Sequence, residues 1–529
     1  MALHSASSVN PPGDTRGLRP TFTFFGLLQK MPGWMPALLG FCLLALTITS
    51  QSIDMDEAQT WDYARLSTLN EVFTELRNDP NSESQMPLGM VLTWAWARIF
   101  GTSEYALRSI NLAWAAVALI AFAYIARRVA IRWLPLLFAI QPFLWYSMDH
   151  ARTPVMQMAG GSLLLLATLD FLAFRGLRVR AAAALCLGAV FLCGASMLGV
   201  VPLAAVGAGL TVKLLYRRIV LPGSVKILLL VTAAMLAVLG AYYLSTLMRG
   251  AGGAKIWSVS PANALFAVYE FLGFQGLGPG RQHLREIMRG VVPASDLLPF
   301  LPGLFSLAAV YALLFFTALK SWFTRPFHHT VRHYPSLIRA WLMGIGVASL
   351  SLLILFILAG VVGFPFWGRH MAGAFPFWVL ALAITIRWAR QGLWRTTARR
   401  ITWALLLLLG VSSLLIRFAP QHRHDDYRSA ATAATQLAAT GHSVWWVADH
   451  SGGEYYGLLF DGTATDPGSV TFAHNIADDR SRPQVIIISR PENFDAFGTA
   501  SNILRTGIYS RSHSFAAFEV WERRLPDVE

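Results

Sequence analysis

Four carboxylates fall within nine residues near the N-terminus, at Asp54, Asp56, Glu57 and Asp62. They directly follow the first long apolar run of the chain. A carboxylate held at a membrane surface is partly desolvated, and it can then act as a general base toward a hydroxyl or amine. A solvated acidic loop is the alternative, and the spacing alone leaves both interpretations open.

Two short turns between later apolar runs carry further polar side chains. The first contains Asp149 and Arg152, an arginine suited to a phosphate and an aspartate that can face a substrate. A plain ion pair between these two residues would explain them equally well. The second turn contains Arg369 and His370, and its planar guanidinium suits phosphate or carboxylate. An interfacial anchor beside aromatic residues is the alternative there.

A long polar stretch at about 248–297 adds Lys255, Glu270, Arg281 and a glycine-rich segment. It is either a mobile lid or a flexible connector. Together with the acidic segment and the two turns, it indicates a cavity for an anionic, phosphate-bearing substrate. The chain has no P-loop and no GxGxxG motif, so the sequence does not indicate the use of ATP.

The elements that must position these residues are membrane spans. Of the 529 residues, 55% are hydrophobic and 14% are charged, and the mean hydropathy is +0.49, which excludes a single soluble domain. A helical span needs about 20 apolar residues. We expect about eleven such spans, near 33–53, 104–126, 130–148, 153–174, 181–199, 200–216, 225–247, 298–319, 340–362, 370–387 and 401–418.

Basic residues predict the orientation of these spans. Arginines and lysines gather in alternate short loops, such as those at 127–132, 175–180 and 213–226, which the positive-inside rule places in the cytoplasm. The N-terminus is then cytoplasmic, and the acidic loop and the chain after Pro420 are extracytoplasmic. The net charge of +14 is spread over several loops, and this distribution argues against nucleic acid as a partner.

The sequence therefore predicts a polytopic α-helical membrane protein with a small C-terminal α/β domain. Residues 1–32 are a disordered cytosolic tail, 33–419 form the transmembrane domain with loops at about 54–103 and 248–297, and 420–529 form the soluble domain. In that domain 426–440 has helical spacing, and 443–449, 483–489 and 515–523 are expected strands. The three cysteines lie inside apolar runs and form no spaced metal-ligand cluster.

Several of these residues lie in motifs that resemble the GT-C class of integral-membrane glycosyltransferases. The branch is glycosyltransferase family 39, with protein O-mannosyltransferases and the lipid A aminoarabinose transferase. The matching motifs are Asp56-Glu57-Ala58, the stretch from Phe100 to Arg108 (FGTSEYALR), Arg127-Arg128, His150-Ala151-Arg152 and Gly368-Arg369-His370. The stretch FGTSEYALR is the most specific of them. The resemblance covers 33–175 best, and 180–340 only through hydropathy.

The resemblance implies an inverting transfer of a sugar from a polyprenyl-phosphate donor to an extracytoplasmic acceptor, such as a glycolipid, a polysaccharide or a protein, in a bacterial inner membrane. It makes Asp56 the base, Glu57 a positioning residue and Asp149 a second carboxylate near the acceptor. It makes Arg152 and Arg369 the residues that bind the donor phosphate, with His370 and Lys255 as further candidates. Residues 54–103 contain no lysine, unlike some members, so Arg77, Lys255 or Arg369 would take over that lysine's contact. We expect no cofactor, and the sequence does not indicate a divalent metal, although it leaves one possible.

Two other classes compete with the transferase. A transporter or flippase for a lipid-linked saccharide would explain the spans and the arginines, but the sequence shows neither duplicated halves nor charges within spans. A structural subunit with a sensor domain would explain the C-terminal domain but not the acidic segment.

Overall fold

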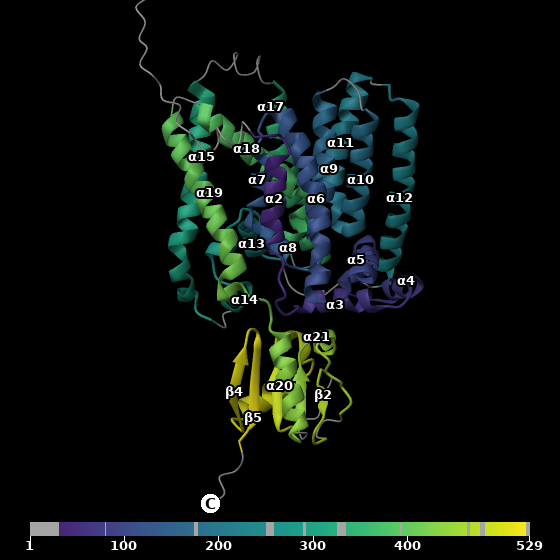
Figure 1. Cartoon of the computed structure of the whole chain (residues 1–529), viewed down its shortest axis with the longest axis vertical. Coiled ribbons are helices and arrows are strands. Elements are labelled where there is room, and N and C mark those ends of the chain that lie inside the picture. Colours follow the sequence, from purple (N-terminus) through teal and green to yellow (C-terminus); the bar gives the residue numbers. More distant parts are fainter. Residues whose placement is uncertain are drawn as a thin grey trace, which may run out of the picture.

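The computed structural model describes residues 31–524 except 80, 174–177, 219, 250–258, 289–291, 325–334, 365, 392–393, 463–465, 475 and 477–481. The expected cytosolic tail lies almost wholly outside the described residues, and so does Lys255. The molecule consists of a helical bundle and a small α/β domain, and the domain lies beyond one end of the bundle (Figure 1). The expected fold class, a helical membrane protein with a C-terminal α/β domain, is confirmed.

Within the described part of the chain, eight helices are long and apolar enough to cross a membrane. They comprise α6 (Glu104–Val129), α9 (Pro154–Ala173), α11 (Val200–Arg217), α12 (Gly223–Met248), α15 (Leu301–Thr324), α17 (Pro335–Val362), α18 (Phe375–Gln391) and α19 (Arg395–Phe418). Two further apolar helices, α2 (Met35–Ala45) and α10 (Val179–Ala195), are shorter. The expected number of about eleven spans is not confirmed.

Two of the expected spans differ for identifiable reasons. The run at 130–148 is divided into α7 (Leu134–Ala139) and α8 (Pro142–Met148), because Pro142 has no amide to continue the first helix and starts the second. The run at 33–53 stays helical only to Ala45, and after a turn at Leu46 and Thr47 the chain has no regular secondary structure as far as Asp54. Backbone carbonyls of Thr49, Gln51 and Ser52 in this irregular segment accept hydrogen bonds from Arg108 instead.

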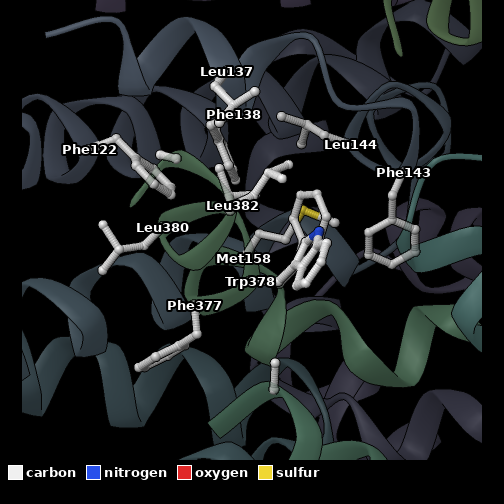
Figure 2. Close-up of a cluster of buried hydrophobic side chains, with 14 of the residues drawn as sticks. Phe122, Leu137, Phe138, Phe143, Leu144, Met158, Phe377, Trp378, Leu380 and Leu382 are labelled. Atoms are coloured by element: carbon white, nitrogen blue, oxygen red, sulfur yellow. The ribbon is translucent and has the colours of Figure 1, made fainter. Parts of the chain in front are cut away.

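The core of the bundle is built around α18. Its residues from Phe375 to Thr385 are buried without a break, as expected of a helix surrounded by other helices on all sides. Phe377, Trp378, Leu380 and Leu382 of this helix lie among side chains of α6, α7, α8 and α9 in Figure 2. The 3-10 helix η5 (Gly368–Ala374), which carries Arg369, leads directly into α18. The turn is therefore fixed to the most deeply buried element of the bundle.

Short helices gather at the end of the bundle that faces the α/β domain (Figure 1). The first loop forms α3 (Met55–Arg65), α4 (Leu69–Asn78), η1 (Ser82–Gln85) and α5 (Pro87–Phe100). The second loop forms α13 (Pro261–Phe271), η3 (Gln275–Leu277), α14 (Arg281–Met288) and η4 (Ala294–Phe300). All the polar segments that the sequence singled out, apart from Lys255, thus belong to structured elements at this end.

The C-terminal domain is a five-stranded mixed sheet between helices. Its strands are β1 (Val444–Val447), β2 (Val470–Phe472), β3 (Val485–Ile488), β4 (Tyr509–Phe515) and β5 (Phe518–Arg523), in the order β2-β1-β3-β5-β4. Strands β2, β1 and β3 are parallel, whereas β5 is antiparallel to β3 and β4. The helices are α20 (Tyr427–Ala439), α21 (His450–Tyr455), α22 (Pro491–Phe494) and α23 (Thr499–Arg505), with η6 (Pro420–His422) before them.

Alternation along the strands explains why both faces of this sheet are covered. Trp446 packs with α20 on one face, and Trp445 packs with α23 on the other, because successive strand residues point to opposite sides. The expected helix and three strands correspond to α20, β1, β3 and β5, while β2 and the longer β4 were not expected. Strand β2 has only three residues, which is too short for a period-two pattern to emerge.

Candidate functional site

The acidic segment forms the first turn of α3, and a capping box fixes it. Asp54 accepts a hydrogen bond from the Glu57 amide at 2.8 Å, and Glu57 accepts one from the Asp54 amide at 3.2 Å. Carboxylates are also stabilised at a helix N-terminus by the helix dipole. Asp54 and Glu57 are thereby used to build the turn, and Asp56 between them is directed elsewhere.

Asp56 lies in a pocket with arginines from two other segments. Arg369 of η5 forms an ion pair with one carboxylate oxygen, and Arg152, in the turn after α8, lies 3.8 Å from the other. Burial raises the pKa of the Asp56 carboxyl, but the charges of Arg369 and Arg152 outweigh burial and hold its pKa well below the usual range. Asp56 is therefore ionised at neutral pH.

Both arginines are held by further carboxylates and backbone groups. Arg152 forms an ion pair with the buried Glu83 of η1 and lies close to Ser82 at 3.2 Å. It forms no ion pair with Asp149 among the described residues, so the plain Asp149–Arg152 pair considered from the sequence is not what holds it. Arg369 is held through its neighbour Gly368, whose amide donates to Glu270 at 2.8 Å.

A third arginine reaches the same pocket from the second loop. Arg281 of α14 lies 2.8 Å from Glu270, donates to the hydroxyl of Tyr146 and lines the pocket with Asp56. The residues that line this pocket include three arginines, Arg152, Arg281 and Arg369, and two carboxylates, Asp56 and Glu270. Such a site suits an anion with several oxygens.

Glu57 is the centre of a separate, fully buried network. Arg108 donates to its two oxygens at 2.7 and 2.6 Å, and the Ala151 amide donates to one of them at 2.7 Å. Burial raises the pKa of Glu57, but the charge and hydrogen bonds of Arg108, together with His424, outweigh burial, so that the pKa lies well below the usual range. Glu57 has no solvent exposure, and it reaches no substrate without movement of the site.

Asp149 belongs to this second network and not to the pocket of Asp56. It accepts hydrogen bonds from the amide and hydroxyl of Thr49 at 2.8 and 3.0 Å and lies 4.0 Å from Arg108. It lines a small neighbouring cavity with His150 and His424. His150 lines both cavities, so it stands between Asp149 and Asp56.

His370, the neighbour of Arg369 in η5, does not line the pocket of Asp56. Its Nδ1 lies 3.2 Å from the Trp367 amide, which it caps, and its ring packs against Phe364 and Phe366. Its position indicates a role in shaping the turn that carries Arg369, which differs from the phosphate contact expected from the sequence.

Four side chains could offer ligand atoms to a metal ion. Atoms of Asp54, Glu57, His150 and His424 lie within 4.8 Å of one another. The guanidinium of Arg108 contacts two of these groups, Glu57 at 2.6 Å and His424 at 3.0 Å. The positive charge of this guanidinium already neutralises part of the negative charge of the four side chains, and it repels a metal cation.

Three important residues were not singled out from the sequence. Arg108 appeared only inside the FGTSEYALR stretch. It lies within the expected span 104–126, so the expectation that the spans carry no charge is wrong at this position, and a charge there is itself a signal of function. Glu83 and His424 carry no local pattern, because their partners lie far away in the chain. Only the fold brings them to the site.

Comparison with known proteins gives distant structural likenesses. No family model matches the sequence, and no curated protein matches it. The structure is similar to that of ArnT from Cupriavidus metallidurans in the apo state, with a TM-score of 0.40 and 14% identity over 92% of this chain and 97% of that one. The same protein bound to undecaprenyl phosphate gives a TM-score of 0.38, 15% identity, and coverage of 92% and 98%. Archaeal oligosaccharyltransferase AglB from Archaeoglobus fulgidus, in complex with an inhibitory peptide and a dolichol-phosphate, gives 0.36 and 12%, with coverage of 94% and 75%.

Proposed function

We propose that this chain is a membrane glycosyltransferase that moves a sugar from a polyprenyl-phosphate donor to an acceptor on the side of the membrane that carries the C-terminal domain. One observation supports the proposal above all. Asp56 and the arginines Arg152, Arg369 and Arg281 come from four separate segments and line one pocket at the end of the bundle. A carboxylate beside phosphate-binding side chains is what this transfer requires.

The arginines bind the donor phosphate in this proposal. A phosphate monoester or diester group offers oxygens that match planar guanidinium groups, and the charge on the leaving phosphate grows as the bond to the sugar breaks. Arg369 is the more accessible of the two partners of Asp56, with 33% of its side chain exposed against 8% for Arg152. Arg369 is therefore the residue that a phosphate reaches first.

Asp56 acts as the general base. The acceptor oxygen forms a bond to the anomeric carbon, its proton passes to the Asp56 carboxylate, and the bond from that carbon to the phosphate oxygen breaks, its electrons leaving with the polyprenyl phosphate. Attack opposite the leaving group inverts the anomeric configuration. A carboxylate paired with two arginines is a weak base, and a donor phosphate that draws Arg369 away would strengthen it.

Glu57 and Asp149 act as positioning residues in this scheme. Glu57 holds the first turn of α3 by its hydrogen bond from Arg108, and Asp149 holds the irregular segment before α3 by its hydrogen bond from the Thr49 amide. Both contacts hold the backbone on either side of Asp56. The proposed donor sugar is a hexose or a pentose, and the proposed acceptor is a glycolipid, a polysaccharide or a protein.

Mass spectrometry of bound lipids tests the proposal directly. The purified wild-type chain and Asp56→Asn are compared for co-purifying lipids, and each is then supplied with membrane extract as the acceptor source. We expect a polyprenyl-phosphate sugar to accumulate in Asp56→Asn and to be consumed by the wild type. A sugar that stays on its lipid in both proteins, while crossing the bilayer of a proteoliposome, would favour the flippase alternative. Ordinary phospholipids alone, with no turnover, would contradict the transferase.

A further inference from the structure

The segment that joins the last span to the α/β domain enters the site. It runs from Ala419 to Asp426 and contains the sequence His422-Arg423-His424-Asp425-Asp426. Its two histidines contact residues of the helical bundle and its loops, and its two aspartates contact residues of the α/β domain. Asp425 forms an ion pair with Arg490 at 2.5 Å, and Asp426 caps α20 by accepting from the Ser429 amide at 3.0 Å.

His424 is the closest contact between this segment and the carboxylate network. Its Nδ1 lies 3.3 Å from Glu57 and 3.0 Å from Arg108, and its Nε2 lies 3.7 Å from Asp149. Only 7% of its side chain is exposed. Its ring also stacks on that of His150 at a centroid distance of 4.5 Å. One imidazole from the segment thus touches four groups that surround α3 and the turn after α8.

The charges around His424 explain why an imidazole suits this position. Burial and Arg108 lower its pKa, but the hydrogen bond to Glu57 and the charges of Glu57 and Asp149 outweigh them, so the pKa of His424 lies above the usual value. Asp54, which contacts the stacked His150 at 3.1 Å, adds a further negative charge nearby. The imidazole of His424 thus lies between two carboxylates, Glu57 and Asp149, at distances of 3.3 and 3.7 Å.

His422 contacts the second loop. Its Nε2 lies 3.2 Å from the carbonyl of Gly276 in η3. The element η3 lies between α13, which carries Glu270, and α14, which begins at Arg281. The two histidines of one short segment therefore contact both loops that build the pocket of Asp56.

We infer that the segment 419–426 couples the seating of the C-terminal domain to the geometry of the Asp56 pocket, with His424 as its positioning residue. The inference rests on the proposed function and assigns the soluble domain a role in catalysis apart from acceptor recognition. His424 holds Glu57, Glu57 fixes the first turn of α3, and that turn aims Asp56. A small displacement of a catalytic group costs about 10²-fold in rate, so the effect is expected in kcat.

Three variants of the full chain test the inference in the transfer assay. His424→Ala removes the contacts of the imidazole, and His424→Gln keeps hydrogen-bonding atoms at this position. His513→Ala, which changes an exposed histidine of β4 in the same domain, is the matched control. We expect His424→Ala to lower kcat by about 10- to 100-fold with the donor KM within about threefold of wild type. We expect His424→Gln to recover part of the loss, and His513→Ala to match the wild type.

The outcomes distinguish a failure of the inference about His424 from a failure of the proposed function. Wild-type kcat in folded His424→Ala overturns the inference and leaves the proposed function standing. A loss in His424→Ala that His424→Gln does not relieve, with an equal rise in donor KM and a lower unfolding temperature, shows a merely structural residue and also overturns it. Absence of transfer by the wild type itself overturns the proposed function, and the inference with it.

Discussion

Asp56 and Glu57 are neighbours in the sequence, yet their surroundings give them different chemistry. Glu57 is enclosed by Arg108 and the Ala151 amide, so that its charge is permanently neutralised. Asp56 is paired with Arg369, which is partly exposed, and in the proposed function the donor phosphate takes this partner over. An exchangeable pair beside a fixed pair is a way to separate a reacting carboxylate from a positioning one.

Arg369→Ala should weaken the use of the donor more than that of the acceptor. In the proposed function, the variant removes the partly exposed guanidinium that meets the donor phosphate first. The loss of one hydrogen-bonded charge contact costs about 1.5–3 kcal/mol, or about 10- to 150-fold in donor KM. Steady-state kinetics with each substrate varied in turn measures the split. Equal changes in the two KM values would contradict the phosphate assignment. Arg98→Ala, on the exposed side of α5, serves as a control.

Arg108→Met should destabilise the whole bundle. It leaves Glu57 buried and unpaired, and it also frees the carbonyls of Thr49, Gln51 and Ser52. Removal of one partner of a buried ion pair costs about 3–5 kcal/mol. Thermal unfolding in detergent measures the loss against Arg98→Met, for which a surface change within about 1 kcal/mol is expected. A similar unfolding temperature for both variants would contradict the role given to Arg108.

At the scale of elements, close approach of backbones sets the position of η5. A Cβ at Gly161 of α9 would lie 2.2 Å from the carbonyl oxygen of Gly373, which no side-chain rotation can relieve. Gly161 is therefore the residue that lets α9 lie directly against η5. Because Arg369 is carried by η5, this contact also sets the distance from Arg369 to Asp56.

Gly161→Ala should both destabilise the fold and lower transfer. Overpacking of a tight contact costs about 1–3 kcal/mol, and the displaced η5 carries Arg369 with it. Gly207→Ala in α11 is the matched control, since nothing lies within 4 Å of a Cβ there and a helix gains about 1 kcal/mol from the change. Thermal unfolding and donor KM are measured for both. The prediction is wrong if the two variants shift the unfolding temperature in the same direction.

The sequence predicts the elements better than it predicts their contacts. Apolar runs locate α6, α9, α11, α12, α15, α17, α18 and α19 because a span leaves a long hydropathy signal. Breaks inside a run are harder to place, as with Pro142, since prolines also occur within intact membrane helices. Asp56, Arg152 and Arg369 could be found because they are charged residues next to spans. Glu83 and His424 could not, because their partners lie 69 and 367 positions away (152 − 83 and 424 − 57).

At the scale of the whole molecule, the α/β domain is seated on α3 by polar contacts. Arg65 lies 3.0 Å from Glu454, Ser451 donates to Asp62, and Arg428 forms an ion pair with Glu104 at the start of α6. Partly exposed pairs of this kind contribute about 0–1 kcal/mol each, so the seating depends on several of them acting together. Because these contacts involve carboxylates, the packing of the α/β domain on α3 depends on pH.

Asp449 makes that seating depend on pH. It caps α21, the helix that packs on α3, by accepting from the Gly452 amide at 2.8 Å. Burial, supported by the negative charges of Asp62, Asp56 and Glu83, raises the pKa of Asp449 to about 7. The folded protein thus keeps a proton on Asp449 that the unfolded chain has already released above about pH 4. Folding stability consequently falls as pH rises from about 4 to 7, and the full cost is present above pH 7.

Asp449→Asn should remove this pH dependence. Asparagine keeps an oxygen for the Gly452 amide but has no proton to lose, so the variant should be more stable than the wild type at pH 8 by about 1–3 kcal/mol and similar to it at pH 5. Thermal unfolding of the full chain at both pH values, with limited proteolysis of the segment 419–426, measures the effect. Asp426→Asn is unsuitable as a control because Asp426 caps α20, so Asp461→Asn, at an exposed position of the domain, is used. An unchanged slope of stability with pH in Asp449→Asn would show that another group controls the seating of the domain.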